Sequence, residues 1–251
     1  MPVHVRDEGP IRVVVLDRPD ARGAVDGEHA AMLAEAFEEL DARADLSVGI
    51  LTGSEGHFCS GADLKAVMAG TMRAEPDGRG PMGPTRLQLS KPVIAAIEGH
   101  AVAGGLELAL WCDLRVASET AVFGVYCRRW GVPLIDGGTV RLPRLIGQSV
   151  ALDLILTGRA VDAHEAKQMG LANRVVPAGQ ALEAALALAR ELAALPQLCL
   201  QQDRASALEQ WGLPHEIAMA NEWARGMVSL TEAAEGAARF ASGEGRHGRS
   251  T

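Results

Sequence analysis

The chain has 251 residues, of which 48% are hydrophobic and 22% are charged, and it carries a formal net charge of −8. This composition is typical of a globular protein and too apolar for a disordered one. The negative charge disfavours binding to the phosphates of nucleic acids, although a local basic patch can still hold a small phosphorylated ligand. The length fits one large domain or a domain with an appended region.

The first ten residues, "MPVHVRDEGP", lack the apolar core of a signal peptide, and no run approaches the ~18 apolar residues of a membrane span. The cysteines at positions 59, 112, 127 and 199 form no C-x-x-C pair, which favours reduced thiols over a disulfide framework or a zinc site. The histidines show no metal-ligand spacing either. We therefore expect a cytoplasmic protein without a bound metal.

Runs of strand-forming residues alternate with helical patterns in the first half of the chain. The β-branched runs at 11–17 and 48–53 predict strands, and residues 27–43 between them place apolar side chains at helical spacing. Further strands are predicted at 92–99 and 121–124. This alternation predicts an α/β protein, but it does not separate an open parallel sheet from a spiral of β-β-α turns.

Residues 70–86 are rich in glycine and proline and predict a surface loop, which is either a solvated linker or the lid or wall of a pocket. Toward the C-terminus the pattern becomes helical. Residues 178–196 predict one helix, ended by a proline. Residues 213–230 and 231–243 predict two more, the second with Thr231 as its N-cap.

An apolar stripe of Ala218, Trp223, Met227 and Leu230 runs along the first of these last two predicted helices. Such a stripe faces either the core of the chain or a partner subunit, and its spacing does not decide between them.

Two short motifs fail in their context. The stretch "GEGRHG" at 243–248 matches a dinucleotide-binding pattern, but it follows a helix instead of a strand and is interpreted as a frayed terminus. The stretch "GQSVA" at 147–151 lacks the closing glycine of a nucleophile elbow, and its Ser149 fits a helix N-cap.

Two stretches share one design, namely "HFCSGADL" at 57–64 and "HAVAGGLELAL" at 100–110. Each leads from a strand region through glycine into a helix, whose first N–H groups are unpaired and carry partial positive charge. Two such N–H groups aimed at one point make an oxyanion hole, and small residues let a ligand approach them. Tight helix–strand packing also selects glycine, so both interpretations stay open.

Glu107 lies in the first turn of the second of these helices, among leucines and a tryptophan. An acid on so apolar a helix is costly unless it is paired or used in chemistry. The alternative is an exposed acid favoured by the helix dipole. The leucines on both sides argue against exposure.

Taken together, these stretches resemble the crotonase, or enoyl-CoA hydratase/isomerase, superfamily. The resemblance covers nearly the whole chain, and several motifs in this order and spacing are far more specific than one. They are "LDRPDARGAVDGEHAAML", "ILTGSEGHFCSGADLKAV", "KPVIAAIEGHAVAGGLELALWCDLRVAS", "AVFGVYCRRWGVPLIDGGTVRLPRLIG" and "ALDLILTGRAVDAHEAKQMGLANRVVP".

The resemblance implies a spiral of β-β-α turns with a helical C-terminal region that makes trimers, often paired into hexamers. It predicts residues 1–195 as the spiral core with a coenzyme A thioester site and residues 196–251 as the trimerisation region. The substrate implied is an acyl-CoA thioester, and no metal or redox cofactor is needed.

The resemblance also implies roles for individual residues. The backbone N–H groups of Ala62 and Gly104 match those that hold the thioester carbonyl in the family. The stretch Ala62, Asp63, Leu64, Lys65 matches the lining of the coenzyme A site. Negative charge that develops on the thioester oxygen as an enolate forms is then stabilised by the two N–H donors.

The sequence departs from the hydratase pattern at one catalytic position. A hydratase of the family uses two glutamates, of which the first matches Glu107 and the second falls on Cys127. A thiol does not hold a catalytic water as a carboxylate does. Cys127 is either a buried inert thiol or a nucleophile whose pKa is lowered by Arg128 or Arg129.

Asp136 follows Cys127 by nine residues, at a position where some isomerases and a dehalogenase of the family carry a catalytic carboxylate. Its apolar surroundings, "VPLID", predict that it is paired or has a raised pKa. The alternative is a turn aspartate whose side chain bonds the N–H groups of Gly137 and Gly138.

Three functions remain. The first is hydration of a 2-enoyl-CoA, with Glu107 as the base that handles water and Asp136 assisting proton delivery. The second is isomerisation of the double bond of an enoyl-CoA, in which a carboxylate moves a proton between Cα and Cγ. The third is a coenzyme A-binding protein with a weakened active site.

Overall fold

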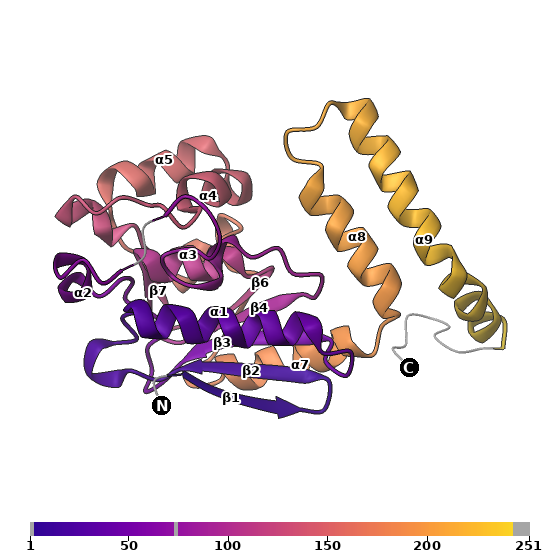
Figure 1. Cartoon of the computed structure of the whole chain (residues 1–251), viewed down its shortest axis with the longest axis horizontal. Helices are drawn as coiled ribbons and strands as arrows, with labels where there is room; N and C mark the ends of the chain where they lie inside the picture. The colour runs from indigo at the N-terminus through magenta and orange to yellow at the C-terminus, as the bar shows by residue number, and fades with distance from the viewer. Residues whose placement is uncertain (1–2, 73–74, 243–251) are drawn as a thin grey trace. The chain divides into compact units, whose positions relative to one another are not determined.

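The computed structural model describes residues 3–72 and 75–242, so the prediction for 243–248 lies outside the described residues. The chain divides into two compact units, Met1–Leu192 and Ala193–Thr251, and each is described by itself (Figure 1). The first unit holds every strand of the described chain, and the second is made of helices.

A six-stranded sheet forms the frame of the first unit, in the order β1-β2-β3-β4-β6-β9. Its strands are β1 Val3–Glu8, β2 Ile11–Leu16, β3 Val48–Gly53, β4 Val93–Ile97, β6 Leu114–Ser118 and β9 Arg174–Val176. All neighbours pair in parallel except β1 and β2, which form an antiparallel hairpin. The sequence patterns predicted each of β2, β3 and β4 but missed β1, whose side chains are mostly exposed.

A smaller sheet in the order β5-β7-β8 forms a second layer. Its strands are β5 His100–Val102, β7 Val122–Gly124 and β8 Val161–Asp162. Single parallel bridges extend this layer, because Cys59 pairs with Ala101 and Ala62 pairs with Val25. The chain thus runs repeatedly from a long strand to a short one and on to a helix, which confirms the predicted spiral of β-β-α turns.

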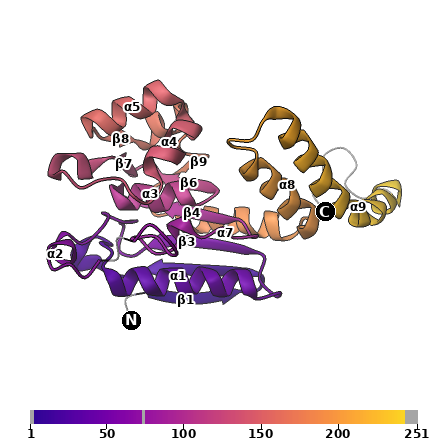
Figure 2. The same cartoon turned by 45° about the horizontal axis from the view of Figure 1, so that its top comes forward.

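The helices of the first unit complete these turns. They are α1 Gly27–Ala42, α2 Leu64–Met68, α3 Gly104–Trp111, α4 Gly138–Ile146, α5 Gln148–Thr157, α6 Ala163–Gln168 and α7 Ala181–Ala193, with 3-10 turns η1 Pro19–Ala21, η2 Pro84–Arg86 and η3 Tyr126–Trp130. In α1, Asp26 caps the N-terminus by accepting from the N–H groups of Glu28 and His29. Its buried face, which includes Phe37 and Leu40, packs on β1 to β3 (Figure 2).

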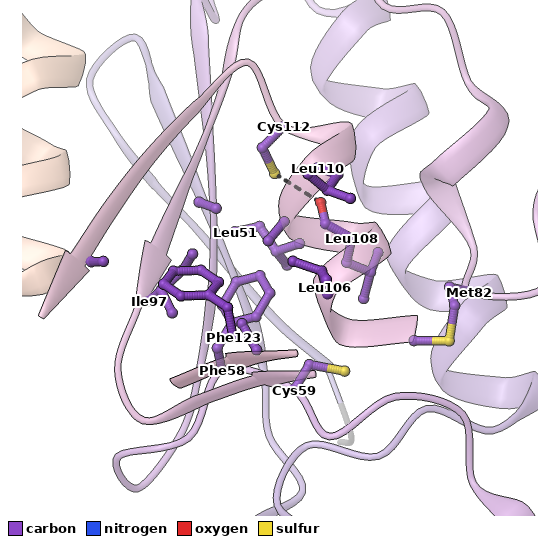
Figure 3. Close-up of a cluster of buried hydrophobic side chains, with 14 of the residues drawn as sticks. Leu51, Phe58, Cys59, Met82, Ile97, Leu106, Leu108, Leu110, Cys112 and Phe123 are labelled. Atoms are coloured by element: carbon purple, nitrogen blue, oxygen red, sulfur yellow. Dashed lines mark hydrogen bonds between the residues drawn. The ribbon is translucent and has the colours of Figure 1, made fainter. Parts of the chain in front are cut away.

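The hydrophobic core lies between the two sheets and α3. Phe58, Ile97 and Phe123 come from three different turns of the spiral and gather beside the leucines of α3 (Figure 3). Because α3 is buried on nearly all sides, a charged side chain on it has little contact with bulk water and depends on partners within the protein.

The loop at 70–86 combines both predicted characters. Residues 75–78 are exposed, but Met82 and Thr85 are buried and Pro84–Arg86 form the 3-10 turn η2. The thioether of Met82 lies beside the first turn of α3 (Figure 3). This half of the loop is therefore a wall of the interior and not a solvated linker.

The second unit is a pair of packed helices, α8 Gln197–Glu209 and α9 His215–Ser242. The predicted boundary at Thr231 is wrong, since α9 runs through it without a break. Arg225 ties the two helices together through Glu209 and through Gln202 at 2.9 Å. The predicted apolar stripe does not face a core, because Trp223 is 72% exposed and Met227 and Leu230 are also exposed.

Gly105 shows how closely the turns of the spiral approach each other. A Cβ atom added to Gly105 would lie 2.1 Å from the backbone oxygen of Cys59, whereas a Cβ added to Gly226 in α9 would meet nothing within 4 Å. Neither backbone conformation requires glycine.

We predict that Gly105→Ala lowers the free energy of unfolding by at least about 2 kcal/mol, because backbone must move to relieve the clash. The matched variant Gly226→Ala should raise helix stability by about 0.5–1 kcal/mol. Denaturant unfolding of both variants measures this. Equal effects at the two positions would contradict the close approach.

Candidate functional site

Two backbone N–H groups without partners meet at one cavity. Within the described residues, neither the Ala62 N–H nor the Gly104 N–H donates a hydrogen bond, and both residues line the same cavity. A Cβ atom on Gly61, which has φ +103°, would lie 3.0 Å from the Gly104 nitrogen. Glycine is therefore required at position 61 both by its backbone conformation and by the nearness of the two donors.

Ala103 sets the direction of the second donor. It precedes α3 with φ +54° and ψ −126°, a conformation that costs a non-glycine residue free energy. Its own N–H donates to the Gly124 oxygen at 2.9 Å, which holds the strained residue against β7. This backbone conformation turns the chain so that α3 begins at Gly104 and the Gly104 N–H group lies at the cavity.

Glu107 is buried, with 2% of its surface exposed, so the interpretation as an exposed first-turn acid is wrong. Its Oε1 accepts from the N–H groups of Asp136 at 2.9 Å and of Gly138 at 2.8 Å. Its other oxygen, Oε2, accepts no hydrogen bond from a described residue and is not fully buried. Because Glu107 lines the cavity, this second oxygen is free to act there.

Asp136 is likewise anchored through one carboxylate oxygen, by residues of the loop at 70–86. Its Oδ1 accepts from the Met82 N–H at 2.9 Å and from the hydroxyl of Thr85. Its Oδ2 accepts no hydrogen bond from a described residue and is likewise not fully buried. The turn-aspartate interpretation fails, because the Gly138 N–H is given to Glu107 instead.

Burial shifts the titration of both carboxyls. Burial raises the pKa of Glu107 to about 7, and the nearby charge of Asp136 adds to the shift, against the two N–H donors. Burial likewise raises the pKa of Asp136, opposed by the bonds from Thr85 and Met82. Glu107 therefore changes charge near neutral pH, where a general acid–base group works best.

Arg141 holds together the backbone segments that anchor the carboxyls of Glu107 and Asp136. Its guanidinium donates to the backbone oxygens of Asp136 at 2.9 Å and of Thr85 at 2.6 Å, which ties the two anchoring loops together. Its positive charge opposes the rise in the pKa of Glu107 and of Asp136. Sequence reasoning missed Arg141 and Thr85, because their partners lie in distant segments and leave no local pattern.

Cys127 lies in the cavity wall close to Glu107, where the second glutamate was expected. Burial and the charge of Glu107 raise the pKa of its thiol, so the nucleophile interpretation is not supported. Arg128 donates to the Ile155 oxygen at 3.0 Å, and Arg129 donates to the Gly158 oxygen and stacks on Tyr126. The two arginines are thus committed to backbone and ring contacts.

The cavity holds about 470 Å³ and brings together five of the predicted site residues, namely Ala62, Leu64, Gly104, Glu107 and Asp136. The other two lie beside it. Asp63 caps α2 and pairs with Arg18 at 2.7 Å, and Lys65 is exposed on α2.

Among the described residues, no group of three or more His, Cys, Asp or Glu side chains is placed to hold a metal ion. None of the described helices combines the length and the apolar character that crossing a membrane requires.

Comparison with known proteins places this geometry in a class. The enoyl-CoA hydratase/isomerase family model matches residues 6–241. The chain is 40% identical to an enoyl-CoA hydratase of Mycobacterium tuberculosis over 85% of this chain and 83% of that protein. It is 37% identical to the (E)-benzylidenesuccinyl-CoA hydratase of Thauera aromatica over 86% of each chain.

A solved structure agrees with these relatives. The crystal structure of an enoyl-CoA hydratase from Mycobacterium marinum superposes with a TM-score of 0.91 at 38% identity and covers 96% of both chains. Two unpaired N–H groups that face one cavity can stabilise negative charge on a bound oxygen atom. The chain belongs to the enoyl-CoA hydratase/isomerase family.

The raised pKa of Glu107 predicts a pH-dependent cost to stability. Between its ordinary pKa of 4.5 and its folded value of about 7, the folded state binds the proton more tightly than the unfolded state. Stability is therefore lost as pH rises through this window, by an amount on the order of 3 kcal/mol.

Glu107→Gln keeps an oxygen for the two N–H donors but carries no charge. We expect its melting temperature to exceed that of the unaltered protein by several degrees at pH 8 and by much less at pH 5. Thermal unfolding at both pH values measures the two differences. If they are equal, Glu107 does not titrate in this window.

Proposed function

We propose that the chain adds water reversibly to the double bond of a 2-trans-enoyl-CoA. The observation that carries the proposal is the free Oε2 of Glu107, a group that titrates near neutral pH, in one cavity with the unpaired N–H groups of Ala62 and Gly104. The names of the related hydratases support the same reaction.

In this mechanism the two N–H groups hold the thioester oxygen. As hydroxide character adds to Cβ, the π electrons of the double bond move to Cα and the carbonyl, and negative charge grows on that oxygen. Loss of one such donor typically costs about 3 kcal/mol in the barrier. The donors are fixed before the reaction by Gly61 and by the strained Ala103, so no reorganisation is needed.

The two carboxyls divide the proton transfers. Ionised Glu107 takes a proton from the attacking water through Oε2 as oxygen bonds to Cβ. Glu107 then returns this proton toward Cα, and Asp136, whose pKa is raised by burial, assists its delivery, so that the enolate becomes the saturated thioester. The sum is one water added across the double bond.

We assign Ala62, Asp63, Leu64 and Lys65 to the coenzyme A arm of the substrate. Ala62 and Leu64 line the cavity, while Lys65 is exposed beside it, where its ammonium group can meet a phosphate. The thioester supplies the coenzyme A, and no separate cofactor is required for the steps above.

A second reaction is favoured by one specific observation. Cys127 lies near Glu107 at the position where the resemblance implies a second glutamate, and Asp136 presents a free Oδ2 to the same cavity. In double-bond isomerisation, a carboxylate takes a proton from one end of the allylic unit and returns it to the other, and no water is consumed. Asp136 would be that carboxylate.

We predict that consumption of crotonyl-CoA, followed by loss of the enoyl-thioester absorbance, falls by at least about 100-fold in Glu107→Gln. Asp136→Asn should slow hydration less than Glu107→Gln does. If instead only the interconversion of 3-enoyl- and 2-enoyl-CoA is seen, and Asp136→Asn abolishes it, isomerisation is the function.

Two further outcomes are informative. If Asp136→Asn changes neither reaction, Asp136 has no catalytic role. If no turnover is seen while acyl-CoA raises the melting temperature, the chain is a coenzyme A-binding protein with a weakened site.

We further propose that the chain assembles into a trimer or a hexamer of two trimers and works in the cytoplasm. The exposed Trp223, Met227 and Leu230 on α9 support assembly, because an apolar stripe of this size is costly in water. The four free cysteines, three of them buried, support a reducing compartment.

Trp223→Asp should shift the mass of the particle from trimer or hexamer toward monomer at micromolar concentration, because a charge would be buried at the interface. Trp223→Phe, which stays apolar, should keep the assembly. Light scattering on a sizing column measures both. A monomeric unaltered protein, or an unchanged mass in Trp223→Asp, would contradict this interface.

A further inference from the structure

The orientation of the Asp136 carboxyl depends on donors from a distant segment of the chain. Its Oδ1 accepts from the Met82 N–H at 2.9 Å and from the hydroxyl of Thr85, and both donors belong to the loop at 70–86. The other oxygen, Oδ2, accepts no hydrogen bond from a described residue and is not fully buried. Because both donors hold Oδ1, it is Oδ2 that the cavity can reach.

The hydrogen bond between Thr85 and Asp136 is closed off from water by the backbone of Gly80. A Cβ atom added to Gly80 would lie 1.9 Å from the Oγ1 of Thr85 and 2.6 Å from the Oδ1 of Asp136. Gly80 is buried, and Thr85 is 0% exposed. In a variant that keeps the volume of the side chain but lacks the hydroxyl, water therefore cannot readily replace the lost donor.

The backbone of Thr85 is held independently of its hydroxyl. The guanidinium of Arg141 donates to the Thr85 oxygen at 2.6 Å and to the Asp136 oxygen at 2.9 Å. Thr85 also lies within η2, where the Leu87 N–H donates to the Pro84 oxygen at 2.8 Å. Removal of the hydroxyl should therefore release the carboxyl of Asp136 without unfolding the turn that carries Thr85.

The charge of Asp136 is set by groups on several neighbouring elements. Burial raises the pKa of its carboxyl, and the hydrogen bond from Thr85 opposes this rise most strongly. The positive charges of Arg86 in η2 and Arg141 in α4 oppose it as well. Glu107 in α3 accepts from the Asp136 N–H at 2.9 Å, and the charge of Asp136 raises the pKa of Glu107. The Thr85 hydroxyl thus acts on a carboxyl that is coupled to the second carboxyl of the site.

We propose that Thr85 is a positioning residue whose hydroxyl fixes the carboxyl of Asp136 so that Oδ2 faces the bound substrate. The inference rests on the proposed function, and it holds for hydration and isomerisation alike, because both reactions give Asp136 a part in proton transfer. Thr85 is not among the described residues that line the cavity, so it acts through Asp136 and not by contact with the substrate.

The first test removes the hydroxyl and keeps the shape of the side chain. In Thr85→Val, we expect kcat for the reaction that the unaltered protein catalyses to fall by about tenfold, because Oδ1 loses a donor and Oδ2 loses its fixed direction. KM should change by less than about twofold, since no contact with the substrate is lost. Thr85→Ser keeps the hydroxyl and should retain kcat within about threefold.

Thr52→Val is the matched control. The hydroxyl of Thr52 is also buried and donates to the Ala96 oxygen at 2.9 Å within the large sheet, and Thr52 is not among the described residues that line the cavity. The same chemical change there should lower the melting temperature but leave kcat within about twofold, because no carboxyl of the site is touched.

A second background shows whether Thr85 acts through Asp136. In Asp136→Asn, the addition of Thr85→Val should lower kcat by less than about twofold, because the carboxylate that Thr85 positions is already absent. The titration of the Asp136 carboxyl, followed by ¹³C NMR and assigned by its loss in Asp136→Asn, is a readout that a merely structural role would not move. Its pKa should rise by about one unit in Thr85→Val and not in Thr85→Ser, because the lost donor stabilises the charged form.

An unchanged kcat in Thr85→Val would overturn the inference, as would an equal loss of kcat in Thr52→Val or in the Asp136→Asn background. These outcomes leave the proposed function intact, because each requires turnover by the unaltered protein. Failure of the unaltered protein to convert any enoyl-CoA would contradict the proposed function itself. The NMR titration then decides the inference alone, and an unchanged pKa of Asp136 in Thr85→Val would overturn it.

Discussion

The buried carboxyl of Glu107 constrains much of the structure around it. Placed on a helix surrounded by core, it needs donors that water cannot supply, and it receives them from the N–H groups of Asp136 and Gly138. Those bonds fix the loop that carries Asp136. A Cβ on Gly138 would lie 2.9 Å from Oε1, so the tight approach also selects glycine there. One oxygen is thereby used for structure and the other is left for chemistry.

The same division recurs across the site. Asp136 is anchored through Oδ1 and presents Oδ2, while positive φ angles at Gly61 and, at a cost in free energy, at Ala103 accompany the two unpaired N–H groups. In each case a polar atom that faces the cavity has no hydrogen-bond partner among the described residues. Arg141 binds the two supporting loops through their backbone oxygens and so links them to each other.

Cys127, at the position where a second glutamate was expected, changes which side chains of the site can transfer protons. A thiol with a raised pKa contributes no charge, so the carboxyls available for proton transfer are Glu107 and Asp136. Cys127 lines the same cavity as these two carboxyls.

The sequence by itself determined the strands β2, β3 and β4, the helix α1, and the two glycine turns that begin α2 and α3, because these depend on local patterns of apolar residues and caps. The resemblance carried by its ordered motifs supplied the spiral. Only the tertiary structure decided that Glu107 bonds the Asp136 and Gly138 N–H groups, that Asp136 bonds Thr85 instead of its own turn, and that Arg141 binds the backbone oxygens of Asp136 and Thr85. These facts depend on contacts between segments far apart in the chain, and no local period or spacing encodes them.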